Sequence, residues 1–207
     1  MNKKRSVFVI GDSISIHYGP YLKESIQENF NYDRKRGIGE ALKDLDKPLG
    51  ANAGDSSMVL KYLQEERDKQ VRYDILLLNC GMHDIRVNRN TLKLQINAEL
   101  YKRNLEEIID LAKKMSKDVV WITTTPIIDM VHNSRKEGFL RFIKDLQLYN
   151  NIAEEIMVGK SIEVIDLYNF TRSLGENIYC DHVHFKDNIR KLQAAFIANN
   201  LNLFKVG

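Results

Sequence analysis

The fold class follows most directly from the stretch Val7-Phe8-Val9-Ile10-Gly11-Asp12-Ser13-Ile14-Ser15. Its first four residues are apolar and β-branched or aromatic, which is typical of a short strand buried on both faces in a parallel sheet. Gly11 and Asp12 end this strand, and apolar residues at every fourth position from Tyr18 to Phe30 predict a helix after it. Ser13 is therefore expected on a strand-to-helix turn, at the sheet edge where open α/β proteins bind ligands.

A serine on such a turn has two common roles. It caps the helix, since serine is among the best N-caps, or it presents its hydroxyl as a nucleophile. The tripeptide Gly11-Asp12-Ser13 alone favours the cap. Pro20 is expected in the first turn of the helix or near its regular start.

The composition is that of a globular protein with one domain, spanning residues 1–207. Hydrophobic residues make up 43% of the chain and charged residues 29%. The net charge is only +3 and the basic residues are dispersed, which argues against a nucleic-acid partner. The sequence has neither a membrane-spanning apolar run of about 18 residues nor a signal peptide, so a cytoplasmic location is expected. Cys80 and Cys180 are expected to be small buried residues, with no disulfide or redox role.

The rest of the chain alternates between predicted strands and helices. Strands are expected at 74–79, 119–124 and 162–165, and helices at 58–69, 94–115, 139–157 and 186–200. Tyr32 to Gly50 is expected to be a long loop with at most a short edge strand and a helical turn at Glu40 to Leu45, and Ile127 to Gly138 a polar connection. This alternation predicts a flavodoxin-like three-layer α/β/α sandwich with a central parallel sheet of about five strands.

Four distant sites each follow a predicted strand or precede a predicted helix: Ser13, Gly54, 81–84 and 181–184. In a doubly wound sheet these junctions gather at one edge. A serine hydroxyl needs a base, and a histidine oriented by an aspartate is the usual one, which Asp181 and His184 supply at a spacing of three. Backbone N–H groups of Ser13 and Gly54, with the ring of His83, are candidate donors to an oxyanion.

These motifs resemble, in order, those of the SGNH, or GDSL-type, esterases and lipases. Residues 11–15 resemble the family's nucleophile block, 52–56 its second block, 81–84 the Gly-x-Asn-Asp block, and 181–184 the Asp-x-x-His block. The resemblance implies the SGNH hydrolase fold and a catalytic triad of Ser13, Asp181 and His184. It also implies an oxyanion hole formed by Ser13, Gly54 and His83.

His83 departs from the family, which usually has asparagine at this position as the side-chain oxyanion donor. A neutral imidazole donates one hydrogen bond, so the role survives if the tautomer is right. Asn79 is an alternative amide, although at the end of a strand it is more suited to joining neighbouring loops. His83 is kept as the predicted donor.

The resemblance implies a carboxylic-ester hydrolase that forms an acyl-serine intermediate and uses no cofactor and no metal. The expected partner is a small-molecule or carbohydrate ester. With no apolar lid evident, a short acyl group is favoured, such as acetyl on a carbohydrate. Alternatives are a thioesterase or lysophospholipase of the same fold, a non-catalytic acyl-glycan-binding relative, and an unrelated phosphate-binding flavodoxin-like protein. The sequence leaves the oligomeric state open.

The remaining polar residues near these motifs have simpler expected roles. His182 has the wrong spacing from Asp181 to be the base and is expected to face solvent or substrate. His17 lines the pocket or is simply exposed, and Asp12 and Asp84 are expected to brace loops by accepting backbone N–H bonds. A metal site built from Asp12, Asp181, His182 and His184 is rejected, because the chain has no Cys or His spacing typical of zinc.

Overall fold

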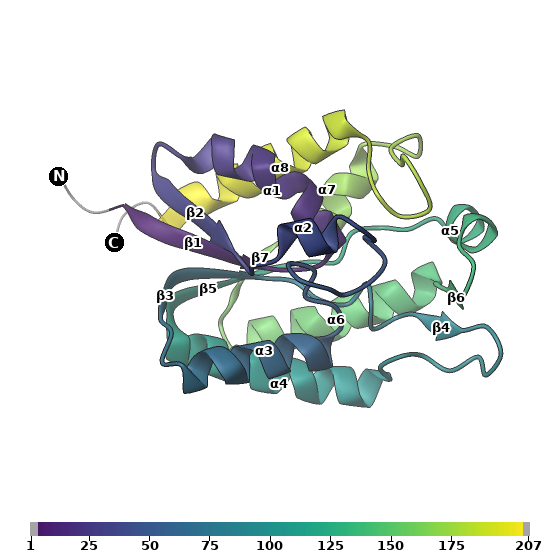
Figure 1. Cartoon of the computed structure of the whole chain (residues 1–207), viewed down its shortest axis with the longest axis horizontal. Coiled ribbons are helices and arrows are strands. Elements are labelled where there is room, and N and C mark those ends of the chain that lie inside the picture. The colour runs from purple at the N-terminus through teal and green to yellow at the C-terminus, as the bar shows by residue number, and fades with distance from the viewer. Residues whose placement is uncertain (1–3, 205–207) are drawn as a thin grey trace.

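A parallel sheet of five strands forms the centre of the computed structural model, which describes residues 4–204 (Figure 1). The strand order is β2(Phe30–Arg34), β1(Arg5–Ile10), β3(Tyr73–Leu78), β5(Ser116–Ile122), β7(Glu163–Ile165), and every neighbouring pair is parallel. After β1, the chain first adds β2 on one side of it and then crosses over to add β3 on the other side. The point at which the strand order reverses therefore lies between β1 and β3. The predicted sheet of about five parallel strands is confirmed.

Helices cover both faces of the sheet (Figure 1). On one face lie α1(Ser13–Ile26), α7(Leu167–Ser173) and α8(Asp187–Leu201), and on the other α3(Ser56–Asp68), α4(Ala98–Met115) and α6(Ile143–Gly159). Each face encloses its own apolar core, as expected when a sheet is buried on both sides. The predicted three-layer α/β/α architecture is therefore confirmed. None of the helices within residues 4–204 is long and apolar enough to cross a membrane.

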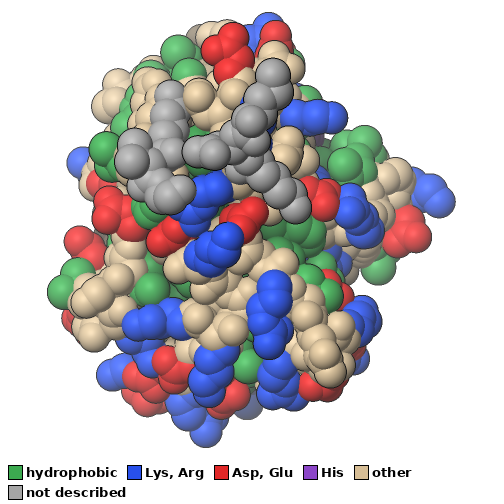
Figure 2. Space-filling view, turned by 90° about the vertical axis from the view of Figure 1, so that its left-hand side faces the viewer, with side chains coloured by type: hydrophobic (Ala, Val, Ile, Leu, Met, Phe, Trp, Pro, Cys, Tyr) green, Lys and Arg blue, Asp and Glu red, His purple; other side chains and the backbone are tan. Residues whose placement is uncertain are grey.

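Smaller elements gather at the end of the sheet to which the strands point (Figure 1). These are α2(Ile38–Ala41), α5(Asp129–Arg135) and an antiparallel pair formed by β4(Val87–Asn88) and β6(Phe139–Leu140), while a 3₁₀ helix, η1(Asn202–Phe204), follows α8. Figure 2 looks at the molecule from the opposite end, where basic and acidic side chains are interspersed.

Three predicted helices differ from the observed ones at their ends. Helix α4 begins at Ala98 and not at Leu94, because Leu94 forms an antiparallel bridge with Val87. Helix α1 ends at Ile26, and Phe30 instead begins the edge strand β2. Pro20 lies inside α1, beyond the first turn. Gly19 before it removes one unfavourable contact, because a proline ring clashes with the Cβ of the preceding residue and glycine has none. Helix α6 begins at Ile143 because Phe139 pairs in β6.

Candidate active site

The nucleophile turn is capped by Asp12 and not by Ser13. Asp12 has extended backbone angles, and its Oδ1 accepts a hydrogen bond from the N–H of Ile14 at 2.9 Å. The hydroxyl of Ser15 donates to the Asp12 carbonyl at 2.6 Å. Ser13 is the first residue of α1, and its hydroxyl is free of any capping bond in the part of the chain described here. The capping interpretation of Ser13 is therefore wrong, and the predicted bracing role of Asp12 is confirmed.

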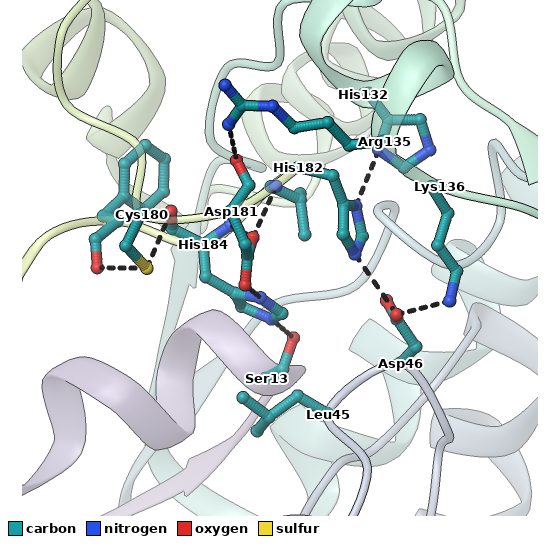
Figure 3. Close-up of polar contacts among 12 residues, drawn as sticks. Ser13, Leu45, Asp46, His132, Arg135, Lys136, Cys180, Asp181, His182 and His184 are labelled. Carbon is teal, nitrogen blue, oxygen red and sulfur yellow. Dashed lines mark hydrogen bonds and ion pairs between the residues drawn. The ribbon is translucent and has the colours of Figure 1, made fainter.

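Ser13, His184 and Asp181 form a hydrogen-bonded series (Figure 3). The Ser13 Oγ lies 2.8 Å from Nε2 of His184, and Nδ1 of the same ring lies 2.7 Å from Oδ2 of Asp181. A carboxylate only accepts hydrogen bonds, so Nδ1 carries the ring proton and Nε2 is free to accept from the serine hydroxyl. Ser13 is 5% exposed and His184 2% exposed, so the two side chains are nearly enclosed.

The second oxygen of Asp181 builds the turn that holds His184. Its Oδ1 accepts hydrogen bonds from the N–H groups of Val183 at 2.8 Å and His184 at 2.7 Å. Burial opposes ionisation, but the hydrogen bond and charge of His184, together with these N–H groups, hold the pKa of Asp181 well below its ordinary value. Asp181 is therefore a stable carboxylate that orients the imidazole.

The second block lies directly beside the nucleophile turn. Asn52 pairs with Gly11 in a parallel bridge, and the N–H of Ala53 donates to the Gly11 carbonyl at 3.0 Å. Gly54 follows at φ +76°, where a Cβ would lie 2.5 Å from the sulfur of Met58. The Gly54 N–H donates to Oδ1 of Asn52 at 3.2 Å, so the predicted oxyanion donor is held by a side chain in this state.

His83 lies on the loop after β3 and is 1% exposed. Burial, followed by the positive charges of Arg86 and Arg141, lowers the pKa of His83 well below its ordinary value, so the ring is neutral. Its Nδ1 is buried and has no hydrogen-bond partner within residues 4–204. No hydrogen bond joins His83 to Ser13 or His184 in this part of the chain, so the role of its ring as an oxyanion donor stays a prediction.

Neighbouring side chains fasten this loop to the other blocks. Asp84 accepts a hydrogen bond from the N–H of Ser56 at 2.9 Å, which confirms its expected bracing role. The side-chain amide of Asn79 donates to the carbonyl of Ile122 at 2.9 Å and so joins the ends of β3 and β5. This agrees with its expected function of joining loops.

His182 belongs to a polar network, and its side chain is only 11% exposed. The expectation that it faces solvent is therefore wrong, and the alternative that it contacts substrate stays a prediction. Its Nδ1 lies 3.0 Å from Nδ1 of His132, and its Nε2 lies 3.2 Å from Oδ2 of Asp46 (Figure 3). Lys136 contacts the same carboxylate oxygen at 2.6 Å. Burial lowers the pKa of His132 to about 3, so this ring is neutral. Sequence patterns do not reveal this network, because its members lie on three segments that are far apart in the sequence.

Other residues near the motifs have defined environments. The ring of His17 packs edge-on against that of His184, with centroids 4.9 Å apart. Cys80 is buried as expected, whereas Cys180 is exposed. Candidate metal-ligating atoms of Asp181, His182 and His184 lie within 4.8 Å of one another, but the hydrogen bonds described above already use these side chains.

Arg141 is a further buried residue that the sequence did not single out. It is 1% exposed, and its Nε donates to the carbonyl of Met82 at 2.8 Å. Burial, followed by the charge of Arg86, lowers the pKa of Arg141 to about 9, so it remains charged at neutral pH. A lone basic residue between Leu140 and Phe142 is the signal that could have identified it.

Comparisons with known proteins agree with this arrangement. Residues 9–190 match the sequence pattern of the GDSL-like lipase/acylhydrolase family. The chain belongs to this family. The comparison with curated proteins returned no match.

Several solved structures share the fold at low sequence identity. A lipase/acylhydrolase from Enterococcus faecalis has a TM-score of 0.71 and 19% identity, covering 97% of this chain and 96% of its own. A catalytic mutant of Axe2, an acetylxylan esterase from Geobacillus stearothermophilus, has a TM-score of 0.69 and 13% identity, with the same coverage. Est24, a carbohydrate acetylesterase from Sinorhizobium meliloti, has a TM-score of 0.64 and 11% identity, covering 97% of this chain and 100% of its own. At these identities the likeness establishes the fold alone.

Proposed function

We propose that this GDSL-family protein is a serine esterase that removes a short acyl group, such as acetyl, from a carbohydrate or another small alcohol. The observation that carries the proposal is the series from Ser13 Oγ through His184 to Asp181, with contacts of 2.8 and 2.7 Å. Family membership and the acetylesterases among its structural neighbours support the reaction class.

In the proposed reaction, Nε2 of His184 takes the Ser13 proton as the oxygen attacks the ester carbonyl. Asp181 stabilises the imidazolium that forms. The N–H groups of Ser13 and Gly54 and the ring of His83 bind the negative oxygen of the tetrahedral intermediate. For Gly54 this requires its N–H to leave Asn52 and turn to the substrate. The imidazolium protonates the departing alcohol, and water activated by His184 then releases the acid.

The nearly enclosed position of Ser13 supports a short acyl group. Ser13 is 5% exposed, and the Asp46 network ties the surrounding loops together. A long acyl chain would have to displace these loops, at the cost of their hydrogen bonds. The proposal therefore favours an acetylesterase over a thioesterase or lysophospholipase of the same fold.

Hydrolysis of p-nitrophenyl esters from acetyl to dodecanoyl tests the proposal, together with acetate release from acetylated xylo-oligosaccharides. We expect the highest kcat/KM for acetyl, a steep fall as the chain lengthens, and loss of activity in Ser13→Ala. A preference for dodecanoyl would overturn the short-acyl assignment. Activity that persists in Ser13→Ala would overturn the mechanism.

A further inference from the structure

A pocket of about 610 Å³ adjoins the segment that carries His184, and it is bounded by α1, β2, α2 and the first turn of α8. The ring of His17 lines this pocket and packs edge-on against the ring of His184, with centroids 4.9 Å apart. Arg190 lines it from α8, and its Nε donates to the carbonyl of Phe185, the residue that follows His184, at 2.6 Å. The pocket therefore meets the predicted base and its chain neighbour at two places.

This position suits the alcohol part of an ester. In serine hydrolases the histidine passes the serine proton to the departing group, so the alcohol oxygen lies close to the histidine. Ser13 and His17 are four residues apart on α1 and so share one face of the helix. The predicted oxyanion donors Gly54 and His83 are not among the residues that line the pocket. The remainder of the alcohol is therefore expected to extend past His17 into this pocket.

The charges that line the pocket are mostly positive. Its basic side chains are Lys23, Arg34, Arg36 and Arg190, and Asp33 is the acidic one. Asp33 is already neutralised, because its two oxygens accept from Arg36 at 2.6 and 2.8 Å. The other three basic side chains form no ion pair within residues 4–204. The pocket thus has an excess of positive charge with no carboxylate of this chain to balance it.

Arg34 is the buried member of this set, with an exposed fraction of 5%. Its Nη1 donates to the carbonyl of Ser15 at 3.0 Å and its Nη2 to the carbonyl of Ala51 at 3.2 Å, so the guanidinium is fixed. A Cβ on Gly19 would lie 3.2 Å from that Nη1 and 2.6 Å from the hydroxyl of Tyr32, so glycine leaves room for both groups beside α1. Burying a cation without an opposite charge is unfavourable, and a bound anion would remove this cost.

The rest of the lining is apolar. Ile16 and Pro20 contribute from α1, and Ile38 and Leu42 from α2 and the residue after it. Ile38 is 46% exposed and Leu42 55% exposed, which is unusual for side chains of this size. Apolar walls with a few fixed charges are typical of a site for a small organic ligand. The lining therefore fits a carbon skeleton that carries a negative group.

We propose that this pocket binds the alcohol part of the ester, and that this alcohol carries a negative group, either a carboxylate or a phosphate. The inference rests on the proposed function and narrows its substrate to short-acyl esters of acidic sugars or other small acidic alcohols. Arginine and lysine are the usual partners of both anions in proteins. The acyl group itself needs no charge.

The first test compares acetyl esters that differ only in the charge of the alcohol. The probes are 4-acetoxybenzoate, 4-acetoxyphenyl phosphate and the neutral methyl 4-acetoxybenzoate, with each kcat/KM divided by the rate of that ester with hydroxide. We expect at least one charged ester to exceed the neutral ester by about tenfold or more at low salt, mainly through KM. The two charged probes then distinguish carboxylate from phosphate.

A charge on the acyl side is the control. Phenyl hydrogen succinate should react no faster than phenyl acetate, because its carboxylate lies on the other side of the scissile bond. Equal values for all three alcohols, or a preference for the succinate, would overturn the inference.

The second test removes the two accessible cations. Lys23→Gln combined with Arg190→Gln should reduce the preference for the charged alcohol to below about twofold. The readout is the ratio of charged to neutral ester, so any general loss of activity in the variant cancels. Arg172→Gln, an exposed arginine on α7 outside the pocket, is the matched control and should keep the wild-type ratio. A wild-type ratio in the double variant would show that the pocket does not recognise the charge.

Binding without reaction separates this inference from the proposed function. Titration calorimetry with 4-hydroxybenzoate, 4-hydroxyphenyl phosphate and phenol should show at least one anion binding about tenfold or more tighter than phenol, and the double variant should lose this difference. Such binding by a protein that hydrolyses no ester would remove the esterase and keep the anion pocket. Hydrolysis that depends on Ser13 but ignores the charge of the alcohol would keep the esterase and remove the pocket's role.

Discussion

The two carboxylate oxygens of Asp181 have different hydrogen-bond partners and different roles. Oδ1 accepts the N–H groups of Val183 and His184 and so shapes the turn, while Oδ2 orients the His184 ring. Because different atoms shape the turn and orient the ring, a substitution can change one role and keep the other. This separation gives a direct kinetic prediction.

Asp181→Asn should keep the turn and lose the reaction. The amide oxygen can still accept the two N–H bonds, but the NH₂ group facing Nδ1 forces that nitrogen to accept, which leaves the proton on Nε2 toward Ser13. We expect kcat to fall on the order of 10³- to 10⁴-fold with little change in thermal stability. The measurement is acetyl-ester hydrolysis beside a melting curve. A loss below about tenfold would contradict the role given to Asp181.

Asp84 makes stability depend on pH in a definite direction. Burial raises its pKa from 3.8 to about 7. The folded state therefore binds this proton more tightly than the unfolded state. The stabilising contribution is fully present below about pH 4 and is lost as the pH rises through about 7.

Asp84→Asn should remove that dependence, since its amide oxygen still accepts the N–H of Ser56. The free energy of unfolding of the variant, minus that of the wild type, should rise by on the order of 2–4 kcal/mol between about pH 4 and pH 8. Urea unfolding of both proteins across this pH range measures the difference in the free energy of unfolding. Asp74→Asn is a control that should stay nearly flat over this range, because hydrogen bonds from Lys117 and Ser6 lower the pKa of Asp74 to about 2 and its contribution is lost only below about pH 4. A flat difference for Asp84→Asn would contradict the assignment.

At the scale of elements, one carboxylate connects the loops around the site. Asp46 lies in the loop after α2, Lys136 follows α5, and His182 lies in the turn before α8. Burial opposes ionisation of Asp46, but hydrogen bonds from His182 and Lys136 hold its pKa well below the ordinary value. These contacts connect three segments that are far apart in the sequence: the loop after α2, the end of α5 and the turn before α8.

Asp46→Ala should therefore loosen two loops at once. We expect hydrogen exchange to rise about tenfold or more in 42–50 and 129–136 and to stay unchanged in the central sheet, with KM rising more than kcat falls. Asp110→Ala is the control, because its pair with Lys160 lies on an exposed surface. Exchange that rises only in 42–50 would show that Asp46 does not couple the loops.

Some strands of the structure could be predicted from the sequence and others could not. The buried apolar runs of β1, β3 and β5 were predictable, because a strand covered on both faces must be apolar throughout. The edge strand β2 was only weakly indicated, since Asn31, Tyr32 and Asp33 belong to a strand with one open side. The sequence predicts helix at the short strand β6, because the apolar residues 139, 140, 142 and 143 fit the period of a helix as well as that of a strand, and only the pairing with β4 decides.

For the site, motif spacing predicted the parts held by local geometry. Asp181 and His184 are three residues apart and meet within one turn. Ser13 contacts His184 because the turn after β1 and the turn before α8 lie at the same edge of the sheet. Arg141 and Asp46 were not predictable, because their importance arises from burial and from contacts between distant loops.

For the whole molecule, parallel strands bring four distant segments to one edge. Residues after β1 and β3 flank the switch point, and the bridge between Gly11 and Asn52 draws the second block in. The turn before α8 adds His184 from the far end of the chain. A reactive serine is the chemical consequence that we propose for this convergence.

Labelling with a fluorophosphonate probe, followed by intact-mass and peptide mass spectrometry, tests that consequence most directly. The account predicts a single covalent adduct on Ser13, absent from Ser13→Ala and strongly slowed in His184→Ala. A folded wild-type protein that stays unlabelled from about pH 6 to 9, or an adduct that persists in Ser13→Ala, would contradict it.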